Sequence, residues 1–214
     1  VCDGRARRQR KLGRRARGWR GSLAGRARSM ASHHREHTVL AAPDPSIERA
    51  ILRDGGGAVV RLTPWGARSD SESTDLLSDR RAVAVMMIGV GRDVTSYTRA
   101  FDGLARVAAT NPDMMLFLDS EAARRAGLWE RADGLGVRGR ISLIDAMEDR
   151  RDLVLRGDVI VHPDARGEHR TLMLDAMASG MAVIAGEDPF VSALIDGRTA
   201  SLLPAGASAA QWGE

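Results

Sequence analysis

The 214-residue sequence contains one cysteine, Cys2, and one lysine, Lys11. A single cysteine cannot form a disulfide within the chain, so a small secreted domain held together by disulfides is excluded. A reducing compartment is expected, and we predict a cytoplasmic protein. Every other fixed cation is an arginine, which we interpret as a coding bias without functional meaning.

Long apolar runs are also missing. No segment approaches the roughly 18 consecutive apolar residues of a membrane-spanning helix, so no transmembrane segment is expected. No apolar stretch follows the basic start of the chain, as a secretory signal peptide requires. The sequence opens on a valine, and we expect it to begin partway through a longer protein.

Positive charge is concentrated at the start of the chain. The first 35 or so residues hold a dense run of arginines with almost no acids, whereas the remainder would be net acidic. Residues 1–38 show no hydrophobic periodicity, so a basic and poorly ordered region is expected. A nucleic-acid or anionic-membrane patch is the alternative, because clustered arginines neutralise phosphates. Only Trp19 adds an aromatic ring and no binding motif accompanies the charge, so no specific nucleic-acid partner is predicted.

Residues 39–80 are expected to form a linker that contains a short helix and a short strand. A helix is predicted over residues 46–52 and a short strand over 58–62, separated by the glycines at 55–57. The polar stretch 69–79 then places a domain boundary near residue 80.

From residue 81 the pattern predicts an α/β domain. The continuous apolar run 82–88 is typical of a strand buried on both faces. A helix over 95–109 follows, with an apolar face formed by Tyr97, Phe101, Leu104, Ala105 and Ala108. Further strands are expected at 114–118, 140–144, 158–162, 181–185 and 199–203, and helices at 121–135, 147–155, 168–179 and 191–195. This alternation predicts one Rossmann-like domain, a doubly wound parallel sheet that binds ligands beyond the carboxyl ends of its strands.

Residues 158–180 combine a buried strand, a proline, a loop and a helix that starts at the loop. Asp175 to Gly180 read Asp-Ala-Met-Ala-Ser-Gly. This segment resembles the donor site of retaining GT-B glycosyltransferases of family 4, or group 1, in which Glu-Ala-Met-Ala-x-Gly stands at the same place. Gly91 and Arg92 are similar to the family's Gly-Arg pair, and the segments 135–144 and 188–204 also resemble family segments in the correct order.

The donor-site segment departs from the family pattern at several positions. Gly167 stands where the family has its first glutamate, and Glu168 follows one residue later, a shift that rotates a side chain by about 100° at a helix start. His169, Arg170 and Thr171 replace the family's Gly-Phe-Gly. Thr98 stands where the family has a lysine.

The resemblance implies that residues 81–214 are the C-terminal half of a GT-B fold and bind a nucleotide-diphosphate sugar for transfer with retention. Arg92 and Gly91 would hold the diphosphate, and Asp175 the ribose. His169, Arg170 and Thr171 would complete the donor site, with Glu168 as the catalytic residue beside the sugar. An arginine can bind phosphate in a bidentate manner, and a helix start offers free N–H groups. Neither a metal nor a cofactor is implied.

Three alternatives stay open for the domain: a working donor-binding domain, a degenerate module that binds nucleotide weakly or not at all, and another Rossmann-like module. In the first, the acceptor-binding N-terminal domain is missing, and the chain alone is expected to lack transferase activity. Several of the candidate residues also have interpretations that involve no ligand. Arg92 and Asp175 can be surface residues, Glu168 a helix N-terminal acid, and His162 a satisfied core or loop histidine.

Overall fold

The computed structural model describes residues 40–42, 44–54, 59–62, 66, 76–77, 79, 81–147, 149–164 and 169–214. The basic region predicted for residues 1–38 lies outside them. The chain divides into two units, between Thr63 and Pro64. In the first unit, strands β1 (Leu40–Ala42) and β2 (Val59–Arg61) pair in parallel and are joined through helix α3 (Pro45–Arg53). The predicted short helix and strand are thus confirmed.

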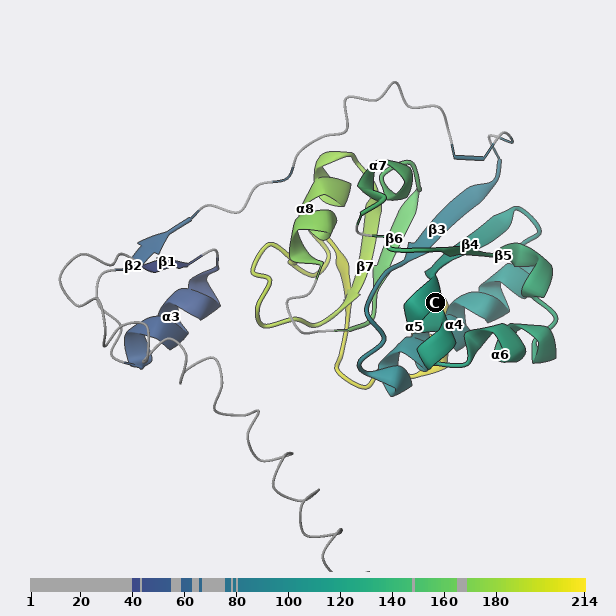
Figure 1. The fold of residues 1–214 in the computed structure, drawn as a ribbon, viewed down its shortest axis with the longest axis horizontal. Helices are drawn as coiled ribbons and strands as arrows, with labels where there is room; N and C mark the ends of the chain where they lie inside the picture. Colours follow the sequence, from purple (N-terminus) through teal and green to yellow (C-terminus); the bar gives the residue numbers. More distant parts are fainter. Residues whose placement is uncertain are drawn as a thin grey trace, which may run out of the picture. The chain divides into compact units, whose positions relative to one another are not determined.

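The second unit contains a six-stranded parallel sheet in the order β5-β4-β3-β6-β7-β8 (Figure 1). The chain moves outward from β3 to β5, then returns to the other side of β3 and moves outward again to β8. The strands are β3 (Val83–Met87), β4 (Met114–Asp119), β5 (Ile141–Ile144), β6 (Val159–His162), β7 (Ala182–Gly186) and β8 (Ser201–Leu203). The predicted doubly wound parallel sheet of a Rossmann-like domain is confirmed.

Helices cover both faces of this sheet, with α4, α5 and α6 on one side and α7 and α8 on the other (Figure 1). The helices are α4 (Val94–Thr110), α5 (Ser120–Arg125), α6 (Leu128–Gly134), α7 (Arg151–Val154), α8 (Arg170–Ala178) and α9 (Ala209–Gly213), with a 3₁₀ turn η1 at Arg138–Arg140. Within the described residues, none of the helices has the length and apolar character needed to cross a membrane.

Strand β3 is buried on both faces, which explains why its sequence is apolar without interruption. Val85 and Met87 pack into the core on the side of α4, α5 and α6, whereas Ala84 and Met86 pack into the core on the side of α8. Successive side chains of a strand point to opposite faces, so burial of both faces requires every position to be apolar. The five positions predicted for the apolar face of α4 are all buried.

Two predicted helices differ in extent from the structure. The helix expected over 121–135 is divided into α5 and α6, because Gly127 adopts a left-handed φ of 61° between them. A left-handed residue ends a right-handed helix, and glycine adopts that conformation without a side-chain clash. The helix expected over 147–155 is limited to α7, Arg151–Val154.

The end of the chain also differs from the prediction. Residues 191–195 contain a turn at 192–193 and no helix, so the expected helix is wrong, while helix α9 was not predicted. Ser208 and Gln211 form a capping box at the start of α9, which satisfies free N–H groups of the first turn. Trp212 of α9 is buried in the core beside α4. Gly180, predicted to follow the end of α8, has the expected left-handed φ of 84°.

Candidate nucleotide-sugar site at the carboxyl edge of the sheet

The site predicted from the sequence lies where the strand order reverses. β3 and β6 are hydrogen-bonded neighbours, with Val85 opposite Val159 and Met87 opposite Val161. From β3 the chain continues toward β4, and from β6 toward β7, so the connections after these two strands diverge. In open α/β sheets, ligands bind in the crevice outside the carboxyl ends at this point.

The connection from β3 to α4 contains the predicted residues Gly91 and Arg92. Gly91 has a left-handed φ of 61°, and a Cβ there would lie 3.1 Å from the Cα of Ala122 on α5. Glycine is therefore needed both for the turn and for the close approach of α5. Arg92 follows as an exposed residue. Asp93 then caps α4, accepting hydrogen bonds from the backbone N–H and the hydroxyl of Ser96 at 3.1 and 3.0 Å.

Helix α8 contains most of the other predicted donor-binding residues. His169 occupies the cap position with a left-handed φ of 52°, and its side chain makes no capping hydrogen bond to the helix. Arg170 and Thr171 form the first turn of α8. The predicted catalytic residue, Glu168, lies outside the described residues, so its role stays a prediction.

Asp175 lies within α8 and is buried, with an exposed fraction of 6%. Its carboxylate forms an ion pair with Arg151 of α7. The same guanidinium donates a hydrogen bond to the hydroxyl of Thr171 at 3.0 Å. Arg151 therefore links two predicted donor-site residues, and it fixes the orientation of the Asp175 side chain.

The sequence analysis did not select Arg151. It lies in the predicted helix 147–155 together with Arg150, and Arg156 follows directly after that helix; nothing in the local pattern distinguishes these three arginines. The packing of α7 against α8 is what places the guanidinium of Arg151 against the buried carboxylate of Asp175.

His162, the last residue of β6, is 1% exposed. Its ring meets that of His169 edge to face, with 5.8 Å between ring centroids and an interplanar angle of 72°. Burial, and secondarily the charge of His169, lowers the pKa of His162 to about 3. Neither imidazole nitrogen has a hydrogen-bond partner among the described residues. The sequence analysis interpreted His162 as a satisfied core or loop histidine. Its burial is confirmed, but the expected hydrogen bonds are absent among the described residues.

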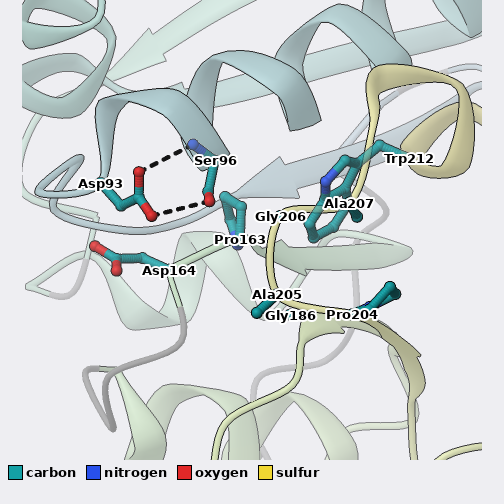
Figure 2. A pocket seen from close by; sticks show the side chains of 10 residues that line it. All are labelled: Asp93, Ser96, Pro163, Asp164, Gly186, Pro204, Ala205, Gly206, Ala207 and Trp212. Atoms are coloured by element: carbon teal, nitrogen blue, oxygen red, sulfur yellow. Dashed lines mark hydrogen bonds between the residues drawn. The ribbon is translucent and has the colours of Figure 1, made fainter.

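A pocket of about 190 Å³ opens at the same edge of the sheet (Figure 2). Its walls come from the start of α4, the end of β6, the end of β7 and the β8–α9 connection. The lining residues are Asp93, Ser96, Pro163, Asp164, Gly186, Pro204, Ala205, Gly206, Ala207 and Trp212. In Figure 2 the capping bonds of Asp93 to Ser96 lie on one side of the pocket and the indole of Trp212 on the other. Both Pro163 and Asp164 directly follow His162.

The structure brings the loop with Gly91 and Arg92 and the start of α8 to one edge of the sheet, on neighbouring strands. Asp175 lies in the second turn of α8 beside Arg151. Within the described part of the chain, no cluster of three or more His, Cys, Asp or Glu side chains could hold a metal ion.

The architecture is that of the C-terminal Rossmann-like half of GT-B glycosyltransferases. WaaG, a glycosyltransferase involved in lipopolysaccharide biosynthesis, matches with a TM-score of 0.64 and 15% identity, over 81% of this chain and 51% of WaaG. The Anabaena protein HepE, solved in complex with UDP and glucose, matches with a TM-score of 0.63 and 16% identity, over 89% of this chain and 56% of HepE.

A third similar structure is a single domain. The C-terminal domain of LpcC, a group 1 glycosyl transferase family protein from Francisella tularensis, matches with a TM-score of 0.55 and 17% identity, over 70% of this chain and 80% of that domain. The chain thus spans about half the length of WaaG and HepE, at 51% and 56%. No protein-family model and no curated protein matches the sequence.

Proposed function

We propose that residues 81–214 are the nucleotide-sugar-binding domain of a retaining, group 1 GT-B glycosyltransferase. One observation carries this proposal. The pairing of β3 with β6 places the loop of Gly91 and Arg92 and the start of α8 side by side at the carboxyl edge of the sheet. This is the position at which doubly wound sheets bind phosphate-containing ligands.

The two elements supply complementary groups for a diphosphate. The first turn of α8 has backbone N–H groups that no side-chain cap of His169 occupies, and a helix start carries a partial positive charge. The exposed guanidinium of Arg92 adds charge-assisted hydrogen bonds. Negative charge grows on the leaving diphosphate as the sugar bond breaks, so these contacts strengthen toward the transition state. The UDP and glucose bound to the similar protein HepE support a nucleotide sugar as the ligand.

Asp175 is assigned to the ribose, whose hydroxyls would donate hydrogen bonds to its carboxylate. Arg151 would hold that carboxylate in place through the ion pair. The same pair favours the second candidate, a domain that keeps the fold without binding a nucleotide, because Arg151 already neutralises Asp175. The two candidates therefore differ in whether any nucleotide diphosphate binds.

The family resemblance implies that the acceptor would bind against a second Rossmann-like domain, and the chain covers only 51% of WaaG and 56% of HepE, which leaves length for such a domain in those proteins. Glu168 would approach the transferred sugar, and His169, Arg170 and Thr171 would contact the donor. Because the acceptor site is not part of these residues, the 214-residue chain is expected to bind donor without transferring it. Turnover by the isolated chain with an acceptor would contradict this division of roles.

The test is a titration of the chain with UDP, GDP and ADP, followed by calorimetry and by thermal melting. One nucleotide is expected to raise the melting temperature, because a ligand that binds only the folded state stabilises it. Arg92→Ala is expected to weaken that binding by about tenfold to a hundredfold, the loss of a hydrogen bond between charged groups. Arg106→Ala is the matched control, since Arg106 is an exposed arginine near the other end of α4. No response to any of the three nucleotides would favour the degenerate module.

A further inference from the structure

His162 is a buried polar side chain without a described hydrogen-bond partner. The residue is 1% exposed, and both ring nitrogens are closed to solvent. A buried donor or acceptor left unsatisfied costs about 1–3 kcal/mol. Nearly all buried polar groups in folded proteins are paired, so an unpaired one requires a reason. An apolar side chain of similar size would fill this position without that cost.

The protonation state of His162 restricts what it can bind. Its pKa is lowered to about 3, so the ring is neutral at physiological pH. A neutral imidazole has one N–H donor and one nitrogen acceptor. An ionised phosphate offers only acceptors and would satisfy one nitrogen. A hydroxyl group both donates and accepts, and two neighbouring sugar hydroxyls can satisfy both nitrogens.

The position of His162 places it beside the proposed donor site. It ends β6, next to the carboxyl end of β3, and its ring contacts that of His169 at the cap of α8. The two residues that follow it, Pro163 and Asp164, line the pocket of about 190 Å³. Ligand pockets for drug-sized molecules begin at roughly 300 Å³, so this hollow suits one sugar ring better than an entire nucleotide sugar.

We propose that His162 binds hydroxyl groups of the glycosyl ring of the nucleotide sugar and is a specificity-determining residue of the donor site. This inference rests on the proposed function. The hydroxyls satisfy the ring nitrogens that the unliganded chain leaves unpaired. These nitrogens are closed to solvent in the structure, so the proposal requires that the ring of His169, which lies against that of His162, moves aside when the sugar binds.

The experiment compares each nucleotide with its sugar conjugate: UDP with UDP-glucose, GDP with GDP-mannose, and ADP with ADP-glucose. Calorimetry on the full chain gives the affinity gained from the sugar as a ratio of two dissociation constants. His162→Leu is expected to reduce this ratio by about fivefold to tenfold, the loss of one or two neutral hydrogen bonds, while binding of the bare nucleotide is unchanged. His162→Asn keeps a donor and an acceptor and is expected to retain part of the ratio.

A second measurement separates this role from a structural one. His162→Leu is expected to raise the melting temperature of the unliganded chain, because the unpaired nitrogens are removed from the core. A residue that only supports the fold would lower it on substitution. Ile160→Val, at a fully buried position of the same strand, is the control that lowers the melting temperature without changing the sugar ratio.

The outcomes distinguish the two proposals. If the wild-type chain binds no nucleotide and no nucleotide sugar, the proposed function fails and this inference fails with it. If nucleotide and sugar conjugate both bind, and His162→Leu leaves the ratio unchanged, only the role of His162 is refuted. If His162→Leu weakens binding of the bare nucleotide and of the sugar conjugate equally, the ratio is again unchanged, and His162 shapes the site without contacting the sugar, which also overturns the inference.

Discussion

Acidification is expected to destabilise the wild-type chain more than the His162→Leu variant. The pKa of His162 lies near 3 in the folded chain, against an ordinary value of 6.5, because burial disfavours the charged ring. As the pH falls, the unfolded chain therefore binds a proton at this residue before the folded chain does. Binding to the unfolded state favours unfolding, so stability is lost as the pH falls from about 6.5 toward 3.

The magnitude follows from the two pKa values. Each pH unit between them changes the free energy of unfolding by at most about 1.36 kcal/mol for one proton. Between about pH 7.5 and pH 4.5 the unfolded chain takes up nearly one proton at His162, and most of the free energy is lost over the last two of these pH units, below the ordinary pKa. The expected loss is about 2.5 kcal/mol, which is a large part of the stability of an ordinary domain.

The assay is urea unfolding of both proteins at a series of pH values. Carboxylates titrate in the same range, but they are common to both chains, and the difference between the two isolates His162. That difference, in favour of the leucine variant, is expected to grow by about 2.5 kcal/mol as the pH is lowered. A difference that stays constant across this range would show that the folded chain takes up the proton at the same pH as the unfolded chain, and it would refute the lowered pKa of the buried His162 ring.

Three further predictions test contacts of the fold and the site. Gly103→Ala should cost about 1–3 kcal/mol in urea unfolding, because a Cβ there would lie 2.5 Å from a backbone oxygen of α9. Gly134→Ala is the control, because a Cβ at Gly134 would have nothing within 4 Å. An equal loss of stability in this control would refute the tight contact of α4 with α9. Tyr97 is the sole tyrosine, and burial raises its pKa. Ultraviolet titration of the folded chain should show no tyrosinate up to about pH 11, and ionisation near pH 10 would contradict this burial. Asp175→Ala should cost about 1–2 kcal/mol, because it removes the partner of the half-buried Arg151. A double-mutant cycle of these two residues should show coupling, and additive effects would argue against their ion pair.

The secondary structure was predictable where the sequence pattern is set by burial. The uninterrupted apolar run of β3 and the apolar face of α4 each follow from what these elements pack against, and both were located from the sequence. The break at Gly127 was missed, because a glycine within an apolar pattern is compatible with a continuous helix as well as with a left-handed turn. Helix α9 was missed because it is short, and its burial against α4 depends on residues distant in the sequence.

For the candidate site, the resemblance to the glycosyltransferase motif identified the loop of Arg92 and the helix of Asp175, and parallel pairing of β3 with β6 is what brings them to one edge. The roles of individual residues within the site were harder to predict from the sequence. Arg151 could not be distinguished from its neighbouring arginines, since only the packing of α7 against α8 pairs it with Asp175. The assignment of Glu168 rests on the sequence resemblance.

The sequence by itself determined the alternation of strands and helices, the parallel class of the sheet and the motif at its edge, because these depend on local periodicity and on residue order. The tertiary structure decided which polar side chains are paired and which are not. His162 shows why: whether a buried ring nitrogen meets an acceptor depends on the positions of β6 and α8 together. Local propensity fixes where a strand ends, but the dielectric environment and the partners at that end come from elements far away in the chain.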